Sequence, residues 1–187
     1  MTAQIGDRFT FKGEDYSIVS ISKSINFSPY EYGLKPFGCC TACWAGYWCH
    51  YDISKDGIVL RNLYINSESG YPKINDVDVS DTEYIGHRVY KNLNLPMNYT
   101  GKILVGNNFI NKYYIHMGYQ RAWAYETLVE LVFENGKLVE EIDQSEVAKK
   151  LRESFDDEKF SIERMLNIPK FVKESFSLDF ADKAWWL

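Results

Sequence analysis

The segment from Leu128 to Ile142 constrains the fold more strongly than any other part of the chain. Its centre, Asn135-Gly136, suits the two positive-φ positions of a type I′ turn, and apolar residues flank it on both sides. A two-residue turn would place Phe133 opposite Leu138, which gives the hairpin one largely apolar face. The same register pairs Leu131 with Glu140, Val129 with Ile142 and Glu134 with Lys137. This segment therefore predicts a pair of antiparallel strands.

Three more hairpins are expected from turn residues set between apolar runs. The high aromatic content, 16% of the chain, also favours strands, because aromatic side chains suit a pleated, half-buried surface. The predicted strand pairs are 8–11 with 16–21, 47–53 with 58–65 around Lys55-Asp56-Gly57, and 99–105 with 109–115 around Gly106-Asn107-Asn108.

Helices are expected after the last hairpin. Asp143 is suited to cap a helix with Glu146 three residues later, and Val147, Leu151 and Phe155 recur on one face. Ser161 is suited to cap a second helix over 162–168. The predicted fold class is α+β: a mainly antiparallel β-sheet built from hairpins, with short C-terminal helices. We expect a single globular domain over residues 1–187, β-rich over 1–142 and helical over 143–187, a length that can bury its own core.

The first residues lack the basic start and apolar run of a secretory signal, and no stretch approaches the roughly 18 apolar residues of a spanning helix. We therefore expect a cytoplasmic protein with no membrane partner. In a reducing compartment the four cysteines should be thiols. The chain also lacks the glycine motifs that cradle phosphates or dinucleotides, so no cofactor is expected.

Charge is distributed unevenly along the chain. Residues 1–127 carry 12 basic and 12 acidic side chains, whereas residues 128–187 carry 9 and 14. No basic cluster is present to neutralise phosphates, so nucleic acid is not expected as a partner. The acidic C-terminal third instead predicts a basic protein partner. The candidate binding residues there are Glu140, Glu141, Asp143, Asp156, Asp157 and Glu158.

The C-terminal residues are unusually apolar and aromatic. Trp185 and Trp186 would form an adhesive patch if they were left in water. We expect them to dock on their own domain, with a partner protein or a homodimer contact as the alternative, since tryptophan often anchors interfaces.

A cysteine-rich segment, 39–50, is the strongest hint of chemistry. Cys40 and Cys43 have the C-x-x-C spacing of a zinc or redox site. Cys49 and His50 could complete four ligands, but adjacent residues of a strand point to opposite faces. We therefore expect structural thiols and no metal, with Cys40 and Cys43 as weak metal candidates. The alternative is a small metal- or thiol-dependent enzyme centred on the Cys39–Cys49 segment, with His116 as a further candidate.

Several short motifs resemble those of an uncharacterised bacterial protein family. They are Gly33-Leu34-Lys35-Pro36, Cys40-Thr41-Ala42-Cys43-Trp44-Ala45-Gly46-Tyr47, His116-Met117-Gly118-Tyr119 and Leu138-Val139-Glu140-Glu141-Ile142-Asp143. In size, acidity and aromatic content the chain also resembles immunity proteins of contact-dependent toxin systems. That resemblance implies a non-enzymatic protein that neutralises a cognate toxin by occluding its active site.

Overall fold

The computed structural model describes residues 2–153, which form one ten-stranded sheet, three short 3-10 helices and one α-helix. The strands are β1 Arg8–Phe11, β2 Glu14–Ile21, β3 Tyr47–Ser54, β4 Gly57–Ile65, β5 Ser80–Asp81, β6 Arg88–Tyr90, β7 Leu95–Pro96, β8 Gly101–Phe109, β9 Tyr125–Glu134 and β10 Lys137–Asp143. The helices are η1 Pro29–Tyr32, η2 Asn111–Tyr113, η3 Ala122–Ala124 and α1 Ser145–Glu153.

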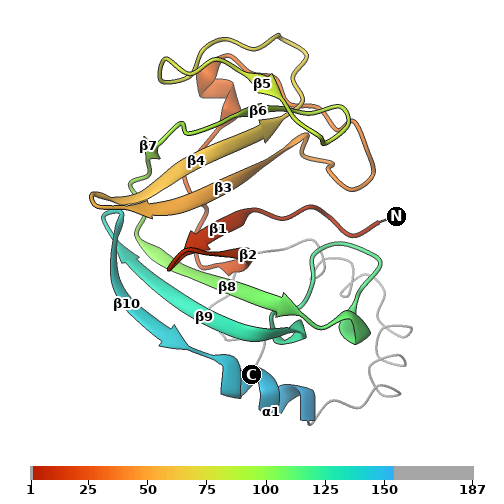
Figure 1. Ribbon diagram of the computed structural model, residues 1–187, viewed down its shortest axis with the longest axis vertical. Helices are drawn as coiled ribbons and strands as arrows, with labels where there is room; N and C mark the ends of the chain where they lie inside the picture. Colours follow the sequence, from red (N-terminus) through yellow and green to blue (C-terminus); the bar gives the residue numbers. More distant parts are fainter. Residues whose placement is uncertain (1, 154–187) are drawn as a thin grey trace.

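The strand order is β10-β9-β8-β2-β1-β3-β4-β6-β5, and β7 pairs with β4 beside this path. Every pairing is antiparallel except that of β1 with β3, which is parallel. Three predicted hairpins are confirmed as β1–β2, β3–β4 and β9–β10. The α+β class with a mainly antiparallel sheet is therefore correct, and Figure 1 shows the one α-helix following the last strand.

The hairpin predicted around Gly106-Asn107-Asn108 is wrong. β8 runs straight through these residues and pairs with β2 on one side and β9 on the other. Gly106 lies in mid-strand because the ring of Tyr125 occupies the space where a side chain would stand; a Cβ there would lie 2.6 Å from the ring. In the sequence, a glycine that is needed for close packing looks the same as a glycine that is needed for a turn, and this is why the hairpin was predicted.

The Asn135-Gly136 turn is confirmed, with φ of 50° and 82° at its two residues. Glu134 pairs with Lys137 and Phe133 with Leu138, as predicted. A bulge at Val139 then shifts the register, so that Glu140 pairs with Val132 and Ile142 with Glu130. The pairings expected further along this hairpin are therefore wrong. The bulge leaves Val139 with 52% of its surface exposed.

The sheet folds back on itself, with β3 and β4 in its upper half, β8 to β10 in its lower half, and β1 and β2 between them (Figure 1). Two hairpin turns meet where the halves converge, and the Ile58 amide donates a 2.7 Å hydrogen bond to the Gly136 carbonyl. The inner faces enclose the main core, which includes Phe9, Leu60 and Phe133. Burial of this apolar surface is the main stabilising contribution.

α1 covers the opposite face of the lower half, where Ala148 packs with Val19, Leu104 and Leu128. The helix begins where predicted, because the Asp143 carboxylate accepts a 2.8 Å hydrogen bond from the Ser145 amide. Hydrogen bonding from the Ser145 side chain and from its backbone amide lowers the pKa of Asp143. The second predicted helix and the rest of 154–187 lie outside the described residues. Within 2–153, no helix is long and apolar enough to cross a membrane.

Candidate functional site

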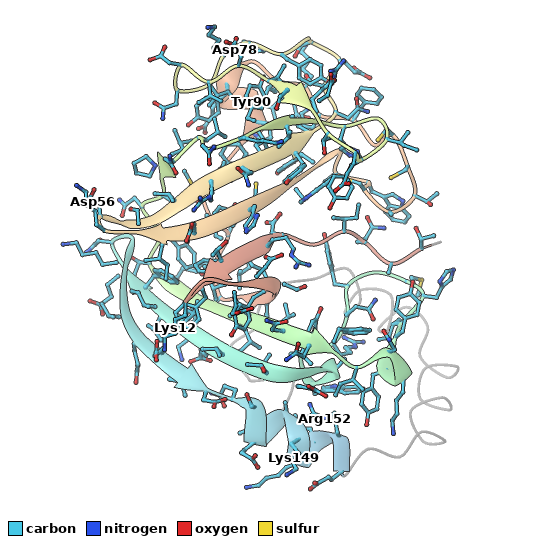
Figure 2. The ribbon with its side chains drawn as sticks, viewed as in Figure 1. Lys12, Asp56, Asp78, Tyr90, Lys149 and Arg152 are labelled. Atoms are coloured by element: carbon cyan, nitrogen blue, oxygen red, sulfur yellow. The ribbon has the colours of Figure 1, made fainter. Side chains whose placement is uncertain are left out.

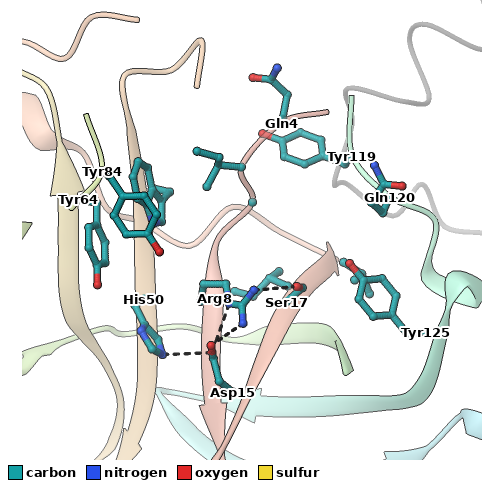
Figure 3. A pocket seen from close by; sticks show the side chains of 15 residues that line it. Gln4, Arg8, Asp15, Ser17, His50, Tyr64, Tyr84, Tyr119, Gln120 and Tyr125 are labelled. Carbon is teal, nitrogen blue, oxygen red and sulfur yellow. Dashed lines mark hydrogen bonds and ion pairs between the residues drawn. The ribbon is translucent and has the colours of Figure 1, made fainter. Parts of the chain in front are cut away.

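A hollow of about 530 Å³ lies on the outer face of β1, β2 and β3. Strand alternation accounts for its floor, since successive side chains point to opposite faces. Arg8, Asp15 and His50 point outward into the hollow, whereas Phe9 and Cys49 point inward to the core. Figure 3 shows this polar floor between two aromatic walls.

The floor is held by an ion pair and hydrogen bonds. Two guanidinium nitrogens of Arg8 donate to the two carboxylate oxygens of Asp15, and a third donates to the Ser17 hydroxyl at 3.4 Å. Nε2 of His50 lies 2.9 Å from the Thr10 hydroxyl and 3.6 Å from Oδ1 of Asp15. Burial lowers the pKa of His50, which favours its uncharged form at neutral pH. The positive and negative charges of the floor therefore nearly balance.

One wall is a cluster of aromatic rings built across β3 and β4. Trp48 and Tyr64 are direct cross-strand partners, and their rings stack with centroids 4.8 Å apart. Tyr84, from the loop before β6, meets both rings edge-on, at 5.2 and 5.6 Å. Tyr84 is 45% exposed and its neighbour Ile85 is 95% exposed, so the rim of this wall faces solvent. The facing wall is formed by Tyr119, Gln120 and Tyr125.

The predicted cysteine candidates are separated by their environments. Cys40 is exposed, Cys43 and Cys49 are buried, and Cys49 faces the core while His50 faces the hollow. The Cys43 amide donates to the Cys40 carbonyl at 3.2 Å, so the C-x-x-C spacing closes a tight turn. Burial raises the pKa of Cys43 to about 11. Within 2–153, no three His, Cys, Asp or Glu side chains group closely enough to hold a metal ion.

A different cysteine and histidine lie close together. His116, the predicted partner of Cys40 and Cys43, contacts the Tyr114 hydroxyl at 3.3 Å. Sγ of Cys39 instead lies 3.6 Å from both ring nitrogens of His87. Burial raises the pKa of Cys39 and lowers that of His87. Both shifts favour a neutral pair over a thiolate with an imidazolium.

The acidic residues predicted to bind a partner lie along one edge of the sheet. Glu140, Glu141 and Asp143 are all exposed on β10, the terminal strand. Glu141 forms a 2.6 Å ion pair with Lys12, which reaches across from the β1–β2 turn (Figure 2). Asp143 is engaged in capping α1. The remaining predicted binding residues, Asp156, Asp157, Glu158, Trp185 and Trp186, lie outside the described residues.

Apart from His50, which the sequence offered as a possible metal ligand, the residues of the hollow were not predicted from the sequence. The floor could have been predicted, because the register of the β1–β2 hairpin sets Arg8 and Asp15 on one face of the sheet. The walls could not have been predicted, because Tyr84 and Tyr119 come from loops that only the complete sheet brings together.

The comparisons with known proteins add no further assignment. No protein-family model matches this chain, and no curated protein or solved structure shows significant similarity to it. The family resemblance of its motifs therefore stays a hypothesis.

Proposed function

We propose that this chain is a non-enzymatic, cytoplasmic protein-binding module, most concretely an immunity protein that neutralises a bacterial toxin by occluding its active site. One observation carries the proposal. The carboxylates of Glu140, Glu141 and Asp143 are exposed together along the long terminal strand of the sheet. A surface of this kind favours a basic partner.

The position of these carboxylates on an edge strand would attract a basic partner and would also disfavour pairing with a second copy of this chain. An edge strand presents unpaired backbone groups, and within the described residues β10 pairs only with β9. Like charges on two copies would repel at this edge, whereas a basic surface would be drawn to it. Because toxins that act on nucleic acid are typically basic, an acidic edge would also speed their encounter with the inhibitor.

Only part of this acidity is available to a partner. Lys12 already offsets the charge of Glu141, and the charge of Asp143 interacts with the start of α1. Glu140 is exposed beside the Val139 bulge. Glu140 and Glu141 are the better pair to reverse, because changing Asp143 would also disturb the helix, whereas reversing Glu141 breaks only its exposed ion pair with Lys12.

The test uses the full-length tagged chain to capture partners from its native host, followed by mass spectrometry. Glu140→Lys with Glu141→Lys should weaken capture of a basic protein by about tenfold or more, while the fold survives. The matched control is Glu31→Lys with Glu68→Lys, which makes the same charge change at exposed sites away from β10. Capture by the wild type should also decline as salt is raised.

Function is then measured by growth. Expression of the captured protein alone should arrest growth, and co-expression of the wild-type chain should restore it. An acidic partner, equal capture by both double variants, or a captured protein without toxicity would contradict the proposal.

A further inference from the structure

The hollow on the outer sheet face is a second surface feature, separate from the acidic edge. From its charge balance, its mixed hydrogen-bonding groups and its aromatic walls, we propose that it binds a neutral, polyhydroxylated ring, the chemistry of a carbohydrate. Its volume of about 530 Å³ lies within the usual range of small-molecule sites. The site is separate from β10, so it goes beyond the proposed protein-binding function.

Charge argues for a neutral ligand. Arg8 and Asp15 are the charged side chains that line the hollow, and they are paired to each other. An anion would have to compete with Asp15 for the guanidinium, and a cation would have to approach Arg8. A neutral ligand meets neither cost, because it leaves the ion pair intact.

The hydrogen-bonding groups argue for hydroxyls. The hollow offers donors and acceptors side by side, because the Arg8 guanidinium, the Asp15 carboxylate and the Ser17 hydroxyl keep N–H groups and lone pairs beyond the bonds they make to one another. The amides of Gln4 and Gln120 also line the hollow, but each is bonded to backbone groups. A hydroxyl both donates and accepts, so a ring carrying several of them can use such mixed groups. A purely aromatic ligand would leave the remaining donor and acceptor positions of Arg8, Asp15 and Ser17 unfilled, at a cost when they are desolvated.

The walls argue for a ring with apolar faces. Tyr64 and Tyr84 stand on one side of the floor and Tyr119 and Tyr125 on the other (Figure 3). Trp48, which is only 4% exposed, supports Tyr64 through their stacked rings. The face of an aromatic ring carries partial negative charge, which attracts the polarised C–H groups on the faces of a sugar. A polar floor between aromatic walls thus matches the equatorial hydroxyls and C–H faces of one molecule.

The position of Tyr125 shows that this wall depends on a specific feature of the sheet. The ring lies over Gly106 of β8, where a Cβ would approach it to 2.6 Å. The absence of a side chain at Gly106 therefore lets a large aromatic ring close one side of the hollow. The other wall is held by the Trp48–Tyr64 stack.

Calorimetric titration of the full-length protein tests the proposal with methyl α-glucoside, N-acetylglucosamine and maltose as neutral probes, and an array of neutral glycans extends the panel. At least one neutral sugar should bind at concentrations up to about 10 mM. Glucuronate, which is negatively charged, and glucosamine, which is positively charged, should each bind about tenfold more weakly than the neutral sugar.

Asp15→Asn provides the discriminating variant, because it leaves the positive charge of Arg8 unbalanced while preserving side-chain shape. It should shift preference towards glucuronate by about tenfold. The matched control is Asp52→Asn, which removes the negative partner of the Arg61–Asp52 pair on the neighbouring strands, outside the hollow. That control should retain the wild-type preference.

Three outcomes would overturn the proposal. The first is that no neutral sugar on the panel or array binds the folded wild type. The second is that charged and neutral sugars bind equally, or that Asp15→Asn and Asp52→Asn behave alike. The third is that adenosine or tyrosine binds in the hollow while sugars do not, which would assign it to flat aromatic ligands.

Discussion

Asp7 is a carboxylic acid set in a largely buried environment that disfavours its charged form. It precedes β1 and accepts a 2.7 Å hydrogen bond from the Cys49 amide. It also lines a small cavity of about 130 Å³ with Cys43, Tyr47 and Tyr119. Burial raises the pKa of Asp7 to about 6, although the hydrogen bond from Cys49 opposes that shift.

This pKa predicts how stability depends on pH. The pKa of Asp7 is near 4 in the unfolded chain and about 6 in the folded protein, so the folded state holds more protons between these values. The contribution of Asp7 to the unfolding free energy should therefore fall as pH rises from 4 to 7, by about 1–3 kcal/mol.

Asp7→Asn should remove that contribution while its amide oxygen still accepts from Cys49. Urea unfolding at about pH 4.5 and 7.5 measures the effect as the difference between wild type and variant. Asp56→Asn, in an exposed turn, is the control. Identical pH dependence in wild type and Asp7→Asn would show that the raised pKa is wrong.

The hairpin turns are the elements on which the shape of the sheet depends. Gly13 and Gly136 both have a φ of 82°, which suits glycine far better than other residues. Their surroundings differ. A Cβ on Gly13 would meet nothing within 4 Å, whereas one on Gly136 would lie 2.8 Å from the Met97 carbonyl oxygen. Gly136 thus serves both its own turn and the contact between the two halves of the sheet.

Replacing each glycine with alanine separates these two roles. Gly13→Ala should lower the unfolding free energy by about 1 kcal/mol through backbone strain alone. Gly136→Ala should cost about 1–3 kcal/mol more, because the new methyl group crowds the Met97 carbonyl. Chemical denaturation of both variants measures the difference. Equal losses would mean that the contact between the halves contributes little.

Across residues 2–153, the sheet has one long edge strand, β10, which pairs with another strand on one side only. The opposite end is finished by the two- and three-residue strands β5 and β6, whereas β10 has seven residues. Short strands offer little template for another chain, and charged side chains protect a longer one. Glu140 and Glu141 are therefore expected to prevent self-association, whatever partner they attract.

Removing these charges should expose the edge to a second copy. Glu140→Thr with Glu141→Thr should promote association at protein concentrations of about 100 µM, because threonine favours strands and carries no charge. Sedimentation velocity compares this variant with Glu31→Thr and Glu68→Thr, which make the same change elsewhere. A monomeric edge variant, or association of both, would argue against protection by charge.

The local features were predictable from the sequence: three of four predicted hairpins, the α+β class and a helix that begins just after Asp143. Turns and caps depend on the φ preferences and side chains of a few adjacent residues, which can be read directly. The Asn135-Gly136 turn was found for this reason, even though the register beyond Val139 was not.

The remaining features of the fold and of the hollow follow from long-range packing, which the sequence pattern did not reveal. Several contacts join residues far apart in the chain. β1 pairs in parallel with β3, β8 pairs with β2 at Gly106, and Tyr84 meets Trp48. Such pairings are selected by which faces bury apolar surface together, a property of the whole sheet. The acidic edge could be anticipated from residue types, whereas the hollow could not, because its walls exist only once distant loops are packed side by side.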